Sequence, residues 1–377
     1  MLLLLSDSKV LKKKLMKRTS NRKTTSEVYA SKRRFLAGAA VATATIAVSE
    51  QLGARTHSGT LRILSWRDYT GKSVLADFTA SSGIAVSADF YDDSDEMFRT
   101  IGKADDRYDL VIASYDYVEE MIGNGLLGPL DHGKLPNIRN LYPVFRDARF
   151  DPGRRYSMPY LWGTQGICYR KSAMRAIPDS WGVLLDSDIH SGRIALPGPD
   201  TLGLALKYLG YSYNSVEPDQ LEAAGALLIR QKSRVKAFVG TNGLELLANG
   251  DVDLTVGWNN EVVGLMEEDD DIGYRVPKEG GLLWQDCICI PRAAANPSGA
   301  HKLINFALEA EVGAAIAENF WYATPNRAAV ELLPDAYRKD HTVFPGMKII
   351  ERCEPAVNLG EAGTRLRDKT WQKVRDA

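Results

Sequence analysis

After residue 58, the apolar positions of the chain follow two alternating spacings. Residues 61–64, which are apolar except for Arg62, predict a short strand, and residues 84–90 alternate apolar with polar side chains, as strands do. The apolar side chains of residues 73–78 recur instead at helical spacing. Asp93 and Glu96 stand three residues apart before the next apolar stretch, which predicts a helix with a capped first turn.

The same alternation continues into the C-terminal third. Strands are predicted at residues 108–113, 192–196, 252–258 and 282–290, and helices at residues 117–122 and 202–209 and after a cap at Ser298. Strands and helices in this order predict an α/β fold with a mainly parallel sheet, and a chain of this length in that style divides into two lobes. Ligands bind beyond the carboxyl ends of such strands, where residues 65–69 and 114–117 fall.

Charge is distributed unevenly along the chain. The 47 Lys and Arg nearly balance the 48 Asp and Glu, yet residues 1–34 hold eleven of the bases and only two of the acids. The rest of the chain therefore carries a net charge of about −10. This charge favours small cationic ligands and argues against nucleic acid, whose phosphates require a basic surface.

The basic N-terminal region has the composition of an export signal. Residues 31–36 supply a charged segment, and residues 37–48 supply a short apolar run that ends in small side chains. The charged segment resembles a twin-arginine motif, with Lys32 in place of the first arginine or with Arg33 and Arg34 as the pair. We expect residues 1–55 to be a removed signal region and the protein to be periplasmic, with a retained membrane anchor as the alternative.

The four cysteines are Cys168, Cys287, Cys289 and Cys353. Cys287 and Cys289 lie two residues apart on a predicted strand, so that both point to one face and bridge poorly. Buried free thiols are therefore expected. Neither these cysteines nor the histidines have the spacing of a metal site, and we expect no metal and no cofactor.

Acids and aromatic side chains recur together at the ends of predicted elements. These groups are Trp66 with Asp68 and Tyr69, Trp258 with Glu261, Trp284 with Asp286, and the further single positions Asp200 and Tyr322. Carboxylates can pair with ammonium groups, and the faces of Trp and Tyr pack on methylenes and attract cations. The combination is typical of a site for a linear amine.

A series of short motifs, taken in their order along the chain, resembles that of the periplasmic spermidine/putrescine-binding proteins of ABC importers. The resemblance covers almost all of residues 60–377. The motifs are Ser65-Trp66-Arg67-Asp68-Tyr69, Met158-Pro159-Tyr160-Leu161-Trp162-Gly163, Gly257-Trp258-Asn259, Pro277-Lys278-Glu279-Gly280-Gly281 and Tyr322-Ala323-Thr324-Pro325-Asn326. The C-terminal segment around Trp371 is more similar to the putrescine-type members.

The resemblance implies a two-lobed periplasmic-binding-protein-like fold. Each lobe is expected to be a mixed, mainly parallel sheet flanked by helices, and a multi-strand hinge joins the two. Lobe 1 would comprise residues 59–164 and 284–331, and lobe 2 residues 165–283 and 332–377. The hinge strands would lie near residues 164–165 and 283–284, with a third crossing near residue 331.

The resemblance also implies which side chains bind a ligand between the lobes. Asp68, Asp200, Glu261 and Asp286 would bind amines, Trp66, Trp258 and Trp284 would clasp methylenes, and Tyr69, Ser114, Asp116 and Tyr322 would complete the site. Asp200 stands where the family has Glu, and Glu261 where it has Asp. Asp116 replaces a Tyr or Ser and Arg67 replaces a small polar residue, so the class of ligand is implied and its identity is open.

Some of these residues have local structural alternatives. Ser114 and Asp200 could cap the helices that follow them, and Asp116 and Glu261 could favour the positive ends of helices. Arg67 is expected to pair with a nearby acid rather than with a ligand.

The implied function is capture of a polyamine of the putrescine or spermidine class outside the cytoplasm and its delivery to the permease subunits of an ABC transporter. The protein is expected to be a monomer and not an enzyme. One alternative is a receptor for agmatine or an amino-acid derivative, whose carboxylate would meet Arg67. Another is an exported carboxylate-dependent hydrolase, although the chain lacks the common nucleophile, zinc, phosphate and dinucleotide motifs.

Overall fold

The structure, a computed structural model, describes residues 59–377 except for residues 68, 71, 104–106 and 240–241. The predicted export signal and Asp68 lie outside the described residues. None of the helices in the described ranges combines the length and the apolar composition that crossing a bilayer requires.

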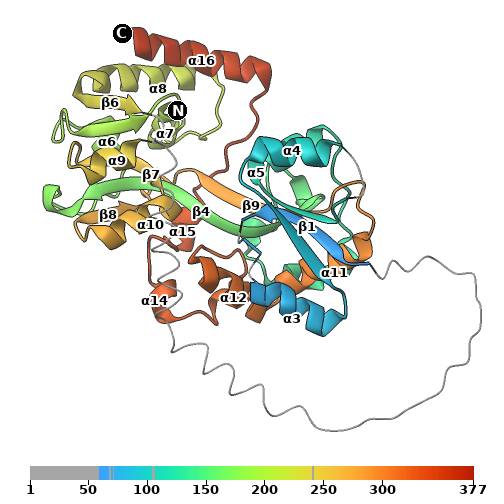
Figure 1. The fold of residues 1–377 in the computed structure, drawn as a ribbon. Helices are drawn as coiled ribbons and strands as arrows, with labels where there is room; N and C mark the ends of the chain where they lie inside the picture. Colours follow the sequence, from blue (N-terminus) through green and yellow to red (C-terminus); the bar gives the residue numbers. More distant parts are fainter. Residues whose placement is uncertain (1–58, 68, 71, 104–106, 240–241) are drawn as a thin grey trace, which may run out of the picture. The chain divides into compact units, whose positions relative to one another are not determined.

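The described strands form one mixed sheet in the order β2-β1-β3-β9-β4-β7-β5-β6, and β8 also pairs with β4 (Figure 1). In the first strand group, β1 (Leu61–Trp66) is parallel to β2 (Val86–Tyr91) and to β3 (Leu110–Ser114). β9 (Leu283–Cys289) is antiparallel to β3 and to the first half of β4 (Ser157–Arg170).

The second strand group begins at the other half of β4. This half is antiparallel to β7 (Leu254–Trp258) and to β8 (Ile272–Arg275). β5 (Ile194–Pro197) is parallel to both β7 and β6 (Val235–Val239). The expected parallel pairing thus occupies the outer part of each group, whereas the strands that join the groups, β4 and β9, are paired antiparallel.

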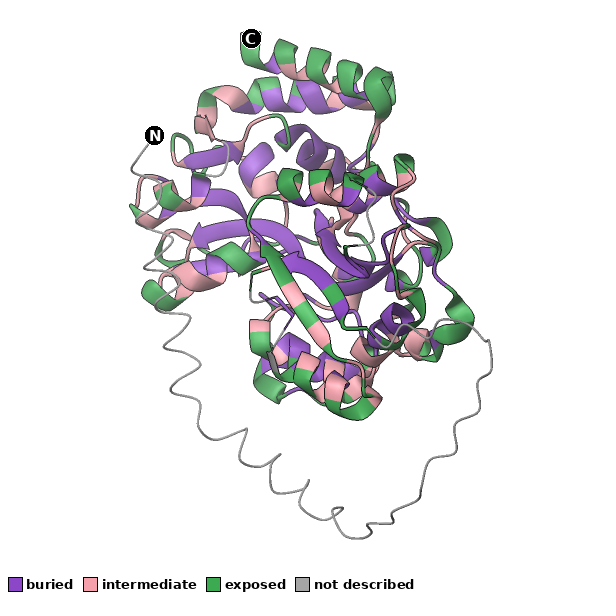
Figure 2. Ribbon diagram, turned by 45° about the vertical axis from the view of Figure 1, so that its right-hand side comes forward, coloured by how far each residue is buried: buried purple, intermediate pink, exposed green. Residues whose placement is uncertain are grey.

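Helices surround both groups. Those associated with the first group or the adjoining C-terminal segments are α3 (Lys72–Ser82), α4 (Ser94–Gly102), α5 (Tyr115–Gly123), α11 (Pro297–Ala307), α12 (Ala310–Phe320), α13 (Arg327–Val330), α14 (Asp335–Arg338) and α15 (Met347–Ile350). The others are α6 (Gly182–Leu185), α7 (Thr201–Tyr208), α8 (Pro218–Gln231), α9 (Gly243–Ala248), α10 (Asn259–Glu268) and α16 (Gly360–Asp376). In Figure 2 most strands are buried and the outer helices alternate buried with exposed positions, as amphipathic helices over a buried sheet require.

Each strand group has its own apolar core. Leu61, Leu110 and Leu161 belong to the core of the first group, and Leu196, Leu204 and Leu254 to that of the second. A smaller cluster around Trp162, Leu283 and Tyr337 lies where β4 and β9 join the groups. Separate cores are consistent with two lobes, while the exact lobe boundaries remain a prediction.

Two helix starts test the capping predictions. The Asp93 carboxylate accepts hydrogen bonds from the backbone N–H groups of Asp95 and Glu96, which confirms that Asp93 caps α4. The predicted cap at Ser298 is wrong, because the Asn296 side chain accepts from the Gly299 N–H and α11 begins at Pro297. Proline is favoured at the first helical position, where its missing N–H leaves no bond unmade. The residue before it, here Asn296, therefore supplies the capping side chain.

All four cysteines are free, and Cys168, Cys287 and Cys289 are buried, as predicted. Cys287 and Cys289 both pack into the cluster that contains Val111 and Met121. They occupy the face of β9 opposite to Trp284 and Asp286, because successive side chains of a strand alternate.

Candidate functional site

Strand β9 places Trp284 and Asp286 on one face. Their positions alternate with the buried Leu283, Gln285 and Cys287, so both side chains remain partly accessible on the opposite face. The register between β9 and β3 sets Asp286 directly against Ser114, the last residue of β3. Two segments that are distant in the sequence therefore meet at a strand end.

The Asp286 carboxylate accepts a 2.5 Å hydrogen bond from the Tyr69 hydroxyl. Tyr69 is only 7% exposed and follows β1 in a turn in which its N–H bonds the Trp66 carbonyl at 3.2 Å. The Tyr160 hydroxyl donates to the Tyr69 carbonyl oxygen at 3.0 Å. These bonds hold the Tyr69 ring and hydroxyl in place against the carboxylate.

The environment of Asp286 disfavours its negative charge. Burial raises the pKa of this carboxyl to about 6, the hydrogen bond from Tyr69 opposes the increase, and the nearby Asp116 adds to it. Asp116 is exposed on the first turn of α5 and accepts a 2.5 Å hydrogen bond from the Ser114 hydroxyl. The structure thus brings two carboxyl groups together with no described basic side chain in ion-pair contact with either.

Aromatic rings surround this pair of acids. The Trp66 and Tyr91 ring centres lie 4.4 Å apart, and the Trp284 and Tyr322 rings meet edge to face at 5.6 Å. The Tyr69 and Tyr322 ring centres are 6.3 Å apart. Rings at these separations present both faces and edges, which can pack on an aliphatic chain or attract a cation.

We call this set of residues the acid–aromatic cluster: Trp66, Tyr69, Tyr91, Ser114, Asp116, Trp284, Asp286 and Tyr322. Tyr91 was not among the predicted site residues. Its signal was nevertheless present, because Tyr91 precedes Asp92 at the end of a predicted strand and so repeats the pairing of aromatic and acid.

The second strand group reaches the cluster through the start of α10. The buried Asn259 side chain accepts hydrogen bonds from the Trp284 indole N–H at 3.3 Å and from the Thr164 N–H at 3.1 Å. The Asn260 side chain on the same turn acts on the Tyr322 hydroxyl and opposes the increase in its pKa. Both aromatic residues are thus linked to the first turn of α10.

Glu261 lies on the same first turn, exposed to solvent. Burial raises the pKa of Tyr322, and the charges of Asp286 and Glu261 both contribute to the increase, so Tyr322 lies within the electrostatic reach of the two acids. Neighbouring protein atoms partly desolvate Glu261 and raise its pKa. Trp258 is half-buried at the end of β7, where it pairs with Gln165 of β4, and it packs on the core of the second group.

Asp200 interacts with a different set of side chains from Asp286. It precedes α7, but its side chain makes no capping hydrogen bond, so the capping alternative is wrong. Its charge acts on Tyr115, Tyr213 and Arg367. Arg67 pairs with Asp92 at 3.0 Å, which confirms the expected pairing with a nearby acid.

Residues 354–358 provide a second connection between the strand groups. The Asn358 N–H donates a 2.8 Å hydrogen bond to the Glu119 carboxylate on α5, and the Ala356 backbone opposes the increase in the pKa of Tyr115. Glu354 forms an ion pair with Lys207 at 2.9 Å and contacts Arg149 at 3.8 Å. A solvent-open hollow of about 530 Å³ lies between this segment and the Asp116 side of α5.

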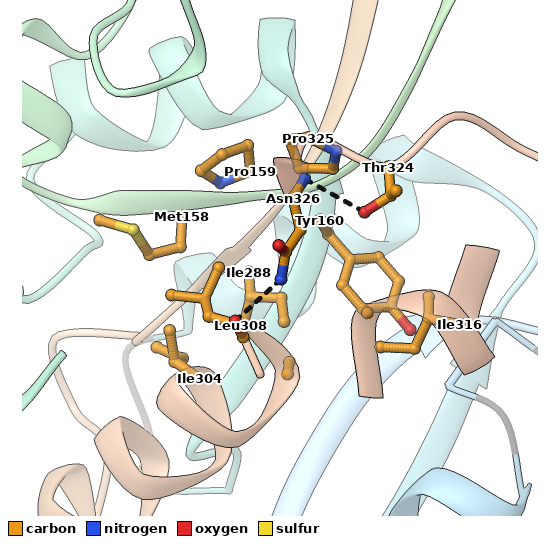
Figure 3. A pocket seen from close by; sticks show the side chains of 12 residues that line it. Met158, Pro159, Tyr160, Ile288, Ile304, Leu308, Ile316, Thr324, Pro325 and Asn326 are labelled. Atoms are coloured by element: carbon orange, nitrogen blue, oxygen red, sulfur yellow. Dashed lines mark hydrogen bonds between the residues drawn. The ribbon is translucent and has the colours of Figure 1, made fainter. Parts of the chain in front are cut away.

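A further cavity lies behind the sheet, between β4 and the helices α11 and α12 (Figure 3). It is lined mainly by apolar side chains, including Met158, Ile288 and Ile316, and the Asn326 side chain beside it already donates to the Leu308 carbonyl at 2.8 Å. Its volume of about 10 Å³ is at most that of one water molecule, so it is a packing gap and not a ligand site.

No cluster of three or more His, Cys, Asp or Glu side chains with the geometry of a metal site occurs within the described ranges. The acid–aromatic cluster can instead neutralise a cation at Asp286 and Asp116 and pack its aliphatic part between rings.

Comparison with known proteins agrees with this chemistry. The family model described as bacterial extracellular solute-binding protein matches residues 73–345. The spermidine/putrescine-binding periplasmic protein of Escherichia coli (strain K12) is 33% identical over 323 residues, covering 84% of this chain and 92% of that protein. The putrescine-binding periplasmic protein PotF of the same organism is 28% identical over 337 residues, covering 84% and 91%.

The fold is similar to that of a solved relative. The spermidine/putrescine ABC transporter substrate-binding protein PotD from Streptococcus pneumoniae strain Canada MDR_19A, in complex with calcium and HEPES, superposes with a TM-score of 0.78. That structure is 31% identical in sequence and covers 84% of this chain and 98% of its own.

Proposed function

Because this chain belongs to the bacterial extracellular solute-binding protein family, we propose that it is the substrate-binding component of an ABC importer for a polyamine of the putrescine or spermidine class. The observation that carries the proposal is the partly buried Asp286 carboxylate, held by Tyr69 and surrounded by aromatic rings. An ammonium group would restore the charge balance that burial of this acid disturbs.

The proposed ligand site combines the acid–aromatic cluster with Asp68, Asp200, Trp258 and Glu261. Asp286 and Asp116 would bind one ammonium group, while Glu261 on the other strand group would bind a second. Trp66, Trp284 and Tyr322 would enclose the methylenes between them. Contacts of Trp284 and Tyr322 with the first turn of α10 support a site formed by both strand groups.

Binding would work by closure of two lobes with the predicted boundaries. A dication that bridges Asp286 and Glu261 binds the closed arrangement more tightly, and this difference in affinity is what shifts the equilibrium towards closure. The closed form would deliver its ligand to the permease subunits of the transporter. Periplasmic relatives support export of this chain, for which residues 1–55 would serve as a twin-arginine-like signal.

Calorimetric titration of the full chain with putrescine, spermidine and agmatine tests the proposal. Butane-1,4-diol, which keeps the length of putrescine without its charges, is the matched control ligand. We expect saturable one-to-one binding of a polyamine, no binding of the diol, and no product after prolonged incubation. Absence of binding by both polyamines would overturn the proposal, and tightest binding of agmatine would reassign the ligand.

A further inference from the structure

Strand pairing places a row of side chains on one face of the sheet, across the strands that join the two groups. Strands β3, β9, β4 and β7 are adjacent in that order (Figure 1). Asp286 of β9 lies opposite Ser114 of β3, and Trp284 of β9 lies opposite Gly163 of β4. Because directly paired residues point to the same face, the row runs from β3 over β9 onto β4.

Gln165 continues this row on β4. It follows Gly163 by two positions and so points to the same face, and it is paired directly with Trp258 of β7. Paired side chains in an antiparallel ladder have Cβ atoms about 5 Å apart. On its other side, a Cβ atom at Gly163 would lie 2.5 Å from the Trp284 ring, so this ring covers β4 where glycine leaves room. Gln165 therefore lies between Trp284 and Trp258.

The side-chain oxygen of Gln165 is buried without a partner. The residue is 5% exposed, and its Oε1 accepts no hydrogen bond from any residue that the structure describes. Its backbone N–H donates to the Leu282 carbonyl at 3.0 Å, so the unmet acceptor belongs to the side chain. A buried acceptor without a donor costs free energy, and folded proteins leave few of them. A donor that arrives with the ligand would remove this cost.

The position of this oxygen in the row indicates which part of a ligand would reach it. Asp286 lies beyond Trp284 on β9, and Glu261 lies on the first turn of α10, directly after β7. In the proposed function these two acids bind the ends of the ligand, and Gln165 lies between them. A methylene group at this point offers no hydrogen-bond donor, whereas a secondary ammonium offers N–H groups that an amide oxygen accepts.

We infer that Gln165 is a specificity-determining residue, whose side-chain oxygen accepts a hydrogen bond from an internal N–H group of the ligand and so favours a triamine such as spermidine over a diamine. The inference rests on the proposed function and concerns the ligand class of the same site. A site that bonds an N–H group rejects an analogue without it, because the buried polar group of the site is then left unpaired.

Arg275 on β8 is the alternative partner for this oxygen within the protein. It is paired with Ile167 and so points to the same face as Gln165, and its Nε is also buried without a partner in the described part of the chain. The two side chains do not bond each other in the structure. If Gln165 served only to pair with Arg275, removal of either side chain would have the same effect on binding.

The experiment compares the affinities of spermidine and octane-1,8-diamine by calorimetry. The second ligand has a methylene where spermidine has its internal N–H group, so the ratio of the two affinities reports on that group. In the wild type, spermidine should bind the more tightly. Q165M should lower the ratio about tenfold, as expected for loss of a hydrogen bond to a charged group. Q165E keeps an acceptor oxygen and should not lower it.

Gln231 supplies a matched control. It is 1% exposed, and its side-chain amide donates to the Leu184 carbonyl at 2.9 Å, so Q231M removes a buried glutamine that already has a partner. Q231M and R275M should both leave the ratio at the wild-type value. Thermal unfolding of each variant establishes that the compared proteins are folded.

The outcomes separate the two proposals. If the wild-type chain binds neither spermidine nor putrescine, the proposed function fails and the inference about Gln165 fails with it. If spermidine binds, the inference alone is overturned by tighter binding of octane-1,8-diamine to the wild type or by an unchanged ratio in Q165M. A loss by the same factor for both ligands would give Gln165 a purely structural role. An equal change of the ratio in R275M would assign the oxygen to a pair with Arg275.

Discussion

Tyr69 donates a 2.5 Å hydrogen bond to Asp286, although the two residues are 217 positions apart in the sequence. The bond partly compensates a carboxyl group that the fold removes from water, since it opposes the increase in pKa that burial causes. A bound ammonium group would complete that compensation.

Replacement of Asp286 should abolish amine binding. In D286N the site retains its shape but loses the charge that faces the ligand, and removal of one partner from a buried ion pair costs several kcal/mol. We expect the affinity for either polyamine to fall about 100-fold or more. Calorimetry measures the loss, and D219N, at an exposed acid on the first turn of α8, should bind normally.

Amine binding should weaken as the pH falls through about 6, the pKa of Asp286 in the unliganded protein. A cation binds the ionised carboxylate, so at lower pH the bound ligand must displace a proton. Calorimetry near this pH in buffers of different ionisation enthalpy should detect proton release in the wild type. Equal proton release by D286N would refute the assignment to this residue.

Stability of the unliganded protein should depend on the same group. Its pKa rises from 3.8 to about 6 on folding, so between these values the folded state binds more protons than the unfolded state. The free energy of unfolding should therefore decrease as the pH rises through this range, with Asp286 contributing about 3 kcal/mol. Urea unfolding at pH 4 and pH 7 measures this change, which should be smaller in D286N by that amount.

Loss of the Tyr69 hydroxyl should shift the pH dependence of binding. In Y69F the Asp286 carboxyl lacks the hydrogen bond that lowers its pKa, so the midpoint for loss of binding should move to higher pH. Affinity at neutral pH should fall about tenfold, as expected for a hydrogen bond to a charged group. The control is Y208F, which removes another tyrosine–aspartate hydrogen bond, the 3.1 Å contact with Asp186, and should leave the midpoint unchanged.

The contact between Glu119 and the Asn358 N–H should contribute to affinity without changing ligand preference. It connects α5 to the segment that follows the second strand group, and its loss in E119A should reduce the affinity for putrescine and spermidine by an equal factor, about threefold. E120A removes the same side chain and charge from the same helix and is the matched control. An equal effect in E120A would show that charge, and not the hydrogen bond, is responsible.

Arg154 should be important for stability. It is 1% exposed, and its guanidinium donates to the Phe145 carbonyl at 2.9 Å and to the Gln285 side chain at 2.6 Å. R154M leaves these buried acceptors unsatisfied and should lower the free energy of unfolding by about 3 kcal/mol. R155M, at the exposed neighbouring arginine, should change urea unfolding little; similar losses in both variants would contradict the assignment.

Local patterns in the sequence were sufficient for most of the elements. Apolar spacing predicted the strands and helices of the first group, and the spacing of Asp93 and Glu96 predicted the cap of α4, because these features depend on neighbouring residues. The cap of α11 was misplaced by two residues. A helix that begins with proline is capped from the preceding residue, Asn296, and the hydroxyl of Ser298 was the more conspicuous signal.

Apolar spacing along the chain was enough to predict the α/β class, and the motif order pointed to a family and to the residue types of a site for cationic ligands. Tertiary packing was needed to bring the Tyr69 hydroxyl to Asp286 and to stack Tyr91 on Trp66. Secondary structure follows from interactions between near neighbours in the chain. The pKa of a carboxyl group and the partner of a charge depend on burial and on distances in space, which arise only when remote segments pack together.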